Sequence, residues 1–120
     1  KDLVNGADGV IIATPEYNHS FPGVLKNALD WMSRPPTGDA RVFSGKPVAL
    51  TGASTGPVGT RMAQAALLPT LRALGTNPWF GRLLFVSNSA QSFDADGNLI
   101  DENLKSRLAE FIRDFADFTK

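Results

Sequence analysis

Short runs of apolar residues occur at intervals along this chain, and in two of them apolar and polar residues do not alternate. Residues 9–14 and 48–51 each form a continuous apolar run that ends in a threonine, contain branched side chains, and are followed by a turn-forming proline or glycine. Runs of this length that are apolar on both sides are typical of strands buried on both faces, as in parallel sheets. Two later segments compete for a third strand: residues 83–86, the most apolar run, and residues 77–80.

Apolar residues recur at helical spacing after each of these strands. The first helix is expected from Pro22 to the two prolines at 35–36, where it must stop. The second is expected to bend at Pro69 and to end at Gly75, and the third to begin with Asp101 as its N-cap. The three stripes comprise, in order, Val24, Leu25, Ala28, Leu29 and Met32; Met62, Ala65, Ala66, Leu67, Leu71 and Leu74; and Leu104, Leu108, Phe111, Ile112 and Phe115.

The order strand–helix–strand–helix–strand–helix predicts an α/β fold with a parallel sheet and right-handed crossovers. Residues 1–120 are expected to form a single domain, since no linker or repeat interrupts them. Residues 1–8 resemble the tail of a helix and its connection, and the strand at 9–14 would lie at a sheet edge. We therefore expect the chain to be the C-terminal part of a larger doubly wound domain.

Composition removes several kinds of chemistry. The 12 basic and 12 acidic residues cancel, so nucleic acid is not an expected partner. Without cysteine and with one histidine, thiol catalysis and cysteine- or histidine-rich metal sites are excluded. A membrane span and a signal peptide are not expected either, which favours a cytoplasmic location. The remaining chemistry must come from oxygen side chains, backbone amides or a cofactor.

Two loops follow the carboxyl ends of predicted strands, where open α/β sheets bind their ligands. In the first, residues 14–22, a carboxylate, a phenol, an amide, an imidazole and a hydroxyl lie close together in the sequence. The prolines that flank these groups restrict the loop, which suits a binding surface. The alternative is a polar loop that caps the next helix through Ser20.

The second loop, residues 52–59, contains G-x-S-x-G between a strand and a helix, the context of a hydrolase nucleophile elbow. A serine hydrolase of that type needs its histidine after the serine, whereas His19 precedes Ser54. Hydrolysis by Ser54 is therefore kept only as an alternative. A flexible turn is a second interpretation, and a third is close approach of the backbone and of the Ser54 and Thr55 hydroxyls to a flat or anionic ligand.

The segment from Pro15 to Trp31, P-E-Y-N-H-S-F-P-G-V-L-K-N-A-L-D-W, closely resembles the signature of the NADPH-dependent FMN reductase family. Weaker agreement follows at residues 43–48, 54–59 and 93–99, so the resemblance covers essentially the whole chain. It implies a flavodoxin-like, three-layer α/β/α fold. It also implies an oxidoreductase that passes electrons from NADPH or NADH through FMN to a quinone, flavin, chromate or azo acceptor.

The resemblance further implies which residues contact FMN. The two loops would line the isoalloxazine ring through Pro15, Glu16, Tyr17 and Asn18 on one side and Ala53, Ser54, Thr55 and Gly56 on the other. Family members commonly form homodimers or homotetramers, and Tyr17 and the helix after Pro22 would belong to that contact. Hydride transfer to flavin requires no protein acid or base, so we expect no catalytic residue, and Glu16 is as well suited to holding its loop as to proton delivery.

The family's phosphate-binding loop, which follows its first strand, has no match in this sequence. If the predicted strands are the third to fifth of a flavodoxin-like sheet, two strand–helix units of roughly 60 residues are expected to precede them. These 120 residues alone would then hold FMN weakly. A flavin-free interaction domain is the alternative from another functional class.

Overall fold

The computed structural model describes residues 1–34 and 42–120. The prolines expected to stop the first helix, at 35–36, lie outside the described residues. The elements, in chain order, are α1 (Asp2–Gly6), β1 (Val10–Ala13), α2 (Gly23–Met32), β2 (Pro47–Ala53), α3 (Arg61–Ala73), β3 (Asn77–Pro78), β4 (Leu84–Val86), a 3-10 turn (Ser89–Gln91) and α4 (Glu102–Phe118). This order confirms the predicted alternation of strands and helices. In the described residues, no helix is both long and apolar enough to span a bilayer.

The sheet is parallel, as predicted, and β2 is its central strand. β1 pairs with β2 in the register Val10 to Val48 through Ala13 to Thr51. The other edge of β2 is shared, because β3 pairs with its beginning and β4 with its end. Both segments that competed for the third strand are therefore strands. β1 lies at an edge of the described sheet, which confirms the expectation for residues 9–14.

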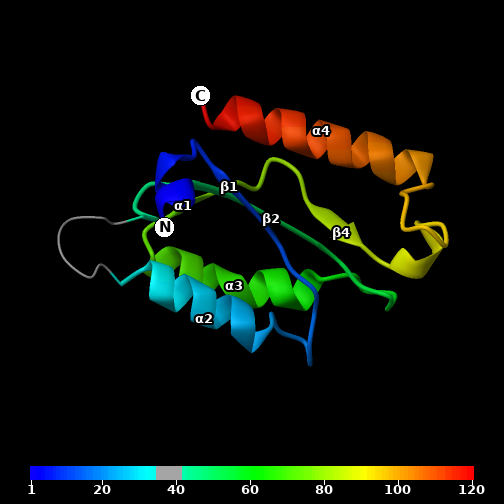
Figure 1. Cartoon of the computed structure of the whole chain (residues 1–120), viewed down its shortest axis with the longest axis horizontal. Coiled ribbons are helices and arrows are strands. Elements are labelled where there is room, and N and C mark those ends of the chain that lie inside the picture. The colour runs from blue at the N-terminus through cyan, green and yellow to red at the C-terminus, as the bar shows by residue number, and fades with distance from the viewer. Residues whose placement is uncertain (35–41) are drawn as a thin grey trace.

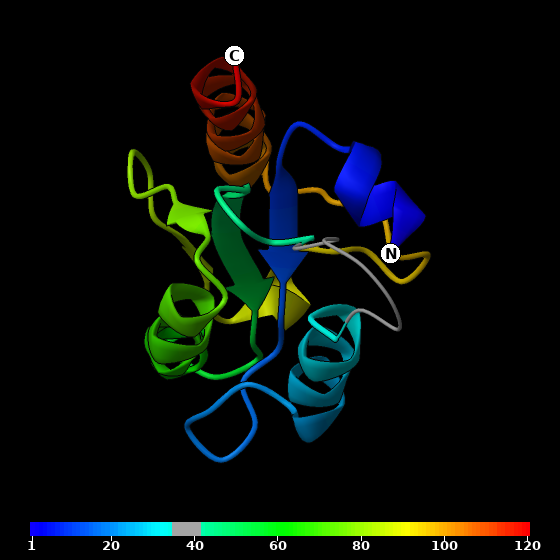
Figure 2. The same ribbon diagram turned by 90° about the vertical axis from the view of Figure 1, so that its left-hand side faces the viewer.

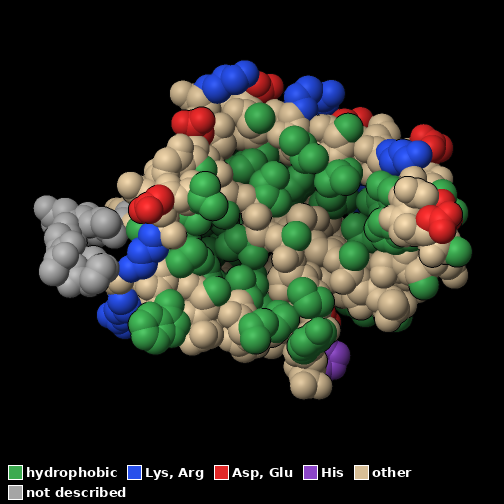
Figure 3. Space-filling view, in the orientation of Figure 1, with side chains coloured by type: hydrophobic (Ala, Val, Ile, Leu, Met, Phe, Trp, Pro, Cys, Tyr) green, Lys and Arg blue, Asp and Glu red, His purple; other side chains and the backbone are tan. Residues whose placement is uncertain are grey.

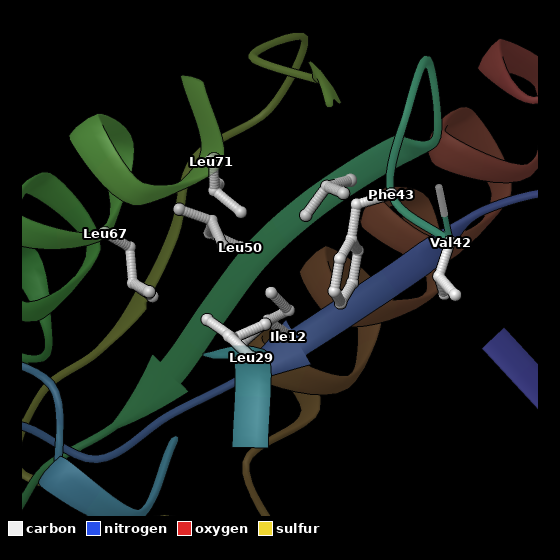
Figure 4. Packing of buried hydrophobic residues seen from close by; sticks show 8 residues of the cluster. Ile12, Leu29, Val42, Phe43, Leu50, Leu67 and Leu71 are labelled. Carbon is white, nitrogen blue, oxygen red and sulfur yellow. The ribbon is translucent and has the colours of Figure 1, made fainter. Parts of the chain in front are cut away.

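Alternating residues of β2 supply two separate cores. Val48 and Leu50 pack under α2 and α3, where Leu29, Leu67 and Leu71 are also buried (Figure 4). The residue between them, Ala49, belongs to the core under α4. The helices thus cover both faces of the sheet, with α2 and α3 on one side and α4 on the other (Figure 2). This arrangement confirms the expected three-layer α/β/α fold.

The α4 stripe is narrower than predicted. Leu104, Phe111 and Phe115 are buried, but Ile112 is 48% exposed. Successive helical residues are about 100° apart, so a helix that aims Phe111 at the sheet turns Ile112 away from it. The expected burial of Ile112 was wrong. Trp79 completes this core by packing its ring edge-on against Phe111, at 5.3 Å between centroids.

The stripes of α2 and α3 also need correction. On α2, Leu29 is buried and Leu25 is half-buried, but Val24 is 79% exposed and Ala28 is exposed as well. The exposed residues on α3 that were predicted to face the core are Met62 and Ala65, whereas Ala63, Gln64, Leu67 and Leu71 are buried. Apolar side chains on these two helices therefore point to solvent as well as to the sheet.

Three predicted helix ends lie within the described residues, and all three are confirmed, the first because Pro22 is the N-cap of α2. The side chain of Asp101 accepts a hydrogen bond from the backbone N–H of Leu104, at 2.9 Å, and so caps α4. Gly75 follows the end of α3 with φ of +70°, the left-handed conformation that glycine adopts without strain.

Candidate functional site

The two loops proposed from the sequence leave the same edge of the sheet, because β1 and β2 are parallel. Gly52 marks how closely the strand ends approach each other. A Cβ at this position would overlap the carbonyl oxygen of Thr14 and lie 2.7 Å from Oγ1 of Thr60. The beginnings of both loops and the start of α3 therefore converge around Gly52.

The first loop ends in a tight hairpin. Tyr17 and Ser20 exchange both backbone hydrogen bonds, at 2.8 and 3.0 Å, and the two residues between them, Asn18 and His19, have φ of 52° and 61°. Positive φ at both central positions is the signature of a type I′ turn. The turn leaves Asn18, His19 and Tyr17 exposed. The alternative role of Ser20 as a helix cap is wrong, since Pro22 occupies the N-cap of α2.

Glu16 turns its side chain away from the hairpin and toward α3. Its Oε2 accepts hydrogen bonds from the backbone N–H groups of Met62, at 2.9 Å, and Ala63, at 3.1 Å. Its other oxygen lies 3.8 Å from Nδ1 of His19. A carboxylate at this place satisfies amides that the helix itself cannot pair, and its charge suits the positive end of the helix dipole.

The second loop is braced against the chain that follows β4. The N–H of Ser54 donates to the carbonyl of Val86, and the carbonyl of Ser54 accepts from the N–H of Ser89. The N–H of Asn88 donates to the carbonyl of Gly56. Sequence analysis did not include residues 86–89 in the site. They could have been predicted as part of it, because the carboxyl end of any parallel strand reaches this same edge of the sheet.

Ser54 does not have the geometry of a nucleophile elbow. Its hydroxyl accepts a hydrogen bond from the N–H of Gly56, at 3.1 Å, in a local turn. The strained backbone of such an elbow is also missing at Ser54, because the non-glycine residues with positive φ within the described part of the chain are Asn18, His19 and Asn88.

Unpaired backbone donors remain where the two loops are exposed. Within residues 1–34 and 42–120, no hydrogen-bond acceptor is paired with the N–H of Glu16, Asn18 or Thr55. A flavin ring is flat and carries carbonyl oxygens and ring nitrogens that accept hydrogen bonds, so these residues fit its edge. A phosphate is not suited to the N-terminus of α3, because Glu16 already occupies the amides of Met62 and Ala63.

Shifted pKa values lie on elements other than these loops. The hydrogen bond and charge of the Arg82 guanidinium hold the pKa of the Asp114 carboxyl below its ordinary value. Hydrogen bonds from the side chain and backbone of Asn98 lower the pKa of Asp94. Asp94 thus organises its own turn. Among residues 1–34 and 42–120, no group of three or more histidine, aspartate or glutamate side chains is arranged to hold a metal ion.

Comparison with known proteins identifies the relatives of this chain. The family model for NADPH-dependent FMN reductase matches residues 1–91. An NAD(P)H-dependent FMN reductase of Pseudomonas aeruginosa is 43% identical over 110 residues, which are 92% of this chain and 58% of that protein. A 2-hydroxy-1,4-benzoquinone reductase of a Burkholderia species is 39% identical over 120 residues, which are 100% of this chain and 64% of its relative.

A solved structure agrees with these sequence matches. FerB, a flavoenzyme NAD(P)H:(acceptor) oxidoreductase of Paracoccus denitrificans, superposes with a TM-score of 0.84 at 36% identity, covering 98% of this chain and 64% of FerB. The chain thus spans about three fifths of the length of these relatives. The expected flavodoxin-like fold is confirmed by this likeness together with the parallel three-layer architecture. By its family match, its fold and its relatives, this chain belongs to the NADPH-dependent FMN reductase family.

Proposed function

We propose that this protein is an FMN-dependent oxidoreductase that takes electrons from NADPH or NADH and passes them to a small-molecule acceptor. The observation that carries the proposal is the set of unpaired backbone amides at Glu16, Asn18 and Thr55, which two loops present at one sheet edge within the described residues. Names of relatives support the acceptor class, since they include a flavin reductase and a benzoquinone reductase. Chromate and azo compounds complete the class expected from the resemblance.

In this proposal the ring of FMN lies between the two loops. Pro15, Glu16, Tyr17 and Asn18 line one side of the ring, and Ala53, Ser54, Thr55 and Gly56 line the other. Bound FMN supplies the two-electron chemistry that the side chains of this protein lack. The protein binds and orients the ring through backbone N–H groups and through side-chain contacts from the two loops, and it needs no side-chain acid or base. The phosphate of FMN is held by a part of the protein other than the start of α3, where Glu16 already uses the amides.

We also propose that the protein forms a homodimer or homotetramer through α2. The exposed side of this helix carries Val24, Ala28 and Trp31, which are spaced so that they form one stripe, and Trp31 is 72% exposed. Figure 3 shows hydrophobic side chains gathered on this side of the molecule, over α2 and α3. The exposed phenol of Tyr17 precedes this helix, so the ring-binding loop would adjoin the contact. A cytoplasmic location, where NAD(P)H is available, belongs to the same proposal.

The full-length protein tests the proposed activity directly. We expect a flavin absorption spectrum with one FMN per subunit, and NADPH- or NADH-dependent bleaching of that spectrum. Tyr17→Ala and Asn18→Ala should each weaken FMN binding by about tenfold, because each removes ring contacts worth about 1.4 kcal/mol. The measurement is quenching of flavin fluorescence in a titration.

Two outcomes would favour the alternatives. Pure protein that never binds flavin would point to an interaction domain. Steady hydrolysis of an activated ester that is lost in Ser54→Ala would point to a serine hydrolase, whereas we expect no such activity to lose.

A further inference from the structure

Glu16 makes hydrogen bonds that reach far along the chain. It belongs to the loop between β1 and α2, yet its Oε2 accepts from Met62 and Ala63, which lie 46 and 47 residues later, in the first turn of α3. The side chain is only 12% exposed, although the neighbouring His19 side chain is 84% exposed. A carboxylate that is both sheltered and paired with two amides is held in one position.

The first turn of α3 depends on this carboxylate. Thr60 is its N-cap residue, but the Thr60 hydroxyl accepts a hydrogen bond from the side chain of Gln64. The amides that a cap would pair are instead paired by Glu16. Hydrogen bonds to an ionised acceptor are roughly twice as strong as neutral ones. This cap, supplied by a residue distant in the sequence, therefore ties the first loop firmly to α3. One side chain therefore connects the first loop to the helix that follows the second loop.

We propose that Glu16 is a positioning residue whose carboxylate sets the separation of the two loops between which FMN is placed. This inference rests on the proposed function. The carboxylate acts through α3 and the second loop, while the backbone N–H of Glu16 has no acceptor among the described residues and stays available to the ring. Proton delivery is the competing role, and the geometry opposes it, because Oε2 accepts from two amides and Oε1 faces His19.

Asp101 offers a matched control. Its carboxylate also accepts a hydrogen bond from an amide in the first turn of a helix, Leu104 in α4, but that helix lies on the opposite face of the sheet from α2 and α3. Asp101→Ala therefore removes a carboxylate cap without touching either loop. Comparing Asp101→Ala with Glu16→Ala therefore distinguishes the effect of losing a helix cap from the effect of losing the connection between the two loops.

The experiment uses the full-length protein with Glu16→Ala, Glu16→Gln and Asp101→Ala. FMN dissociation constants come from fluorescence titration, and hydrogen exchange of the flavin-free proteins is followed by mass spectrometry. Glu16→Ala should raise the dissociation constant by about tenfold or more and speed exchange in both residues 15–20 and 54–63. Glu16→Gln should recover most of the affinity, because its amide oxygen can accept from the same two N–H groups. Asp101→Ala should lower the melting temperature comparably but leave FMN affinity within about twofold of wild type.

Three results would overturn the inference. Equal loss of FMN affinity in Glu16→Ala and Asp101→Ala would mean that loss of any helix cap weakens FMN binding, and that Glu16 has no specific role in positioning the loops. Turnover at saturating FMN that is as low in Glu16→Gln as in Glu16→Ala would mean that Glu16 delivers a proton. If wild-type protein binds no FMN, the proposed function fails, and the exchange data then decide alone: unchanged exchange in Glu16→Ala contradicts the tie between the loops, and faster exchange confined to both loops supports it.

Discussion

Gly52 occupies a point in β2 where the backbone leaves no room for a side chain. It is buried, and a Cβ there would overlap the carbonyl oxygen of Thr14 and crowd the Thr60 side chain at 2.7 Å. The obstacle at Thr14 is backbone and cannot rotate away. Any larger residue must therefore separate β1 from the end of β2, which also moves the two loops that follow these strands.

We predict that Gly52→Ala lowers the free energy of unfolding by about 3 kcal/mol, at the upper end of the usual cost of overpacking. Gly23→Ala is the control, because a Cβ at the start of α2 meets nothing within 4 Å. The control should be neutral or stabilising by a few tenths of a kcal/mol, since alanine favours a helix. Urea unfolding measures both, and equal stability of the two variants would contradict the prediction.

At the scale of the element, α4 tests how a helix is oriented on the sheet. Phe111 is almost fully buried and Ile112 is about half exposed. Phe111→Ala should cost about 3–5 kcal/mol, as expected for removing a buried aromatic ring, whereas Ile112→Ala should cost less than about 1 kcal/mol. Denaturant midpoints of the two variants give the comparison. A larger effect at Ile112 would mean that α4 is rotated by about one residue.

An ion pair ties the segment before β4 to α4 and gives a pH prediction. The Nε–H of Arg82 donates to Asp114, and this hydrogen bond and the positive charge lower the pKa of the Asp114 carboxyl in the folded protein. The contribution of the pair to stability is therefore complete above the ordinary aspartate pKa and is lost as the pH falls toward the lower, folded value. In Arg82→Gln, the pKa of Asp114 should rise toward that ordinary value. Carboxyl carbon NMR titration of the wild-type and variant proteins measures this shift.

Particular elements show what the sequence can and cannot predict. β1 and β2 were predictable because a strand that is apolar on both sides has few other stable environments. The outward-facing Val24 and Ile112 were not, because an apolar stripe wider than a helix face does not say which of its residues touches the sheet. The tie from Glu16 to Met62 was also out of reach, since 46 residues separate its ends and it follows from how the strands align.

At the scale of the whole molecule, the exposed stripe on α2 predicts how copies associate. Trp31→Glu places a charge within the proposed contact, and burying an unpaired charge is costly, so the full-length protein should dissociate toward the monomer. Arg107→Glu, on the exposed side of α4, is the control and should leave the assembly unchanged. Sedimentation velocity measures both. A wild-type monomer, or an unaltered oligomer in Trp31→Glu, would contradict the prediction.

The alternation along β2 restricts how this strand can change length. Val48 and Leu50 belong to one core and Ala49 to the other, and the strand is paired on both edges. Insertion or deletion of one residue inside β2 would send the large side chains into the space that fits alanine and alanine into the space that fits valine and leucine. Two residues could be added or removed with the facing preserved. Gaps in alignments of related chains should therefore avoid residues 47–53, and tolerated length changes should gather in the turns on either side.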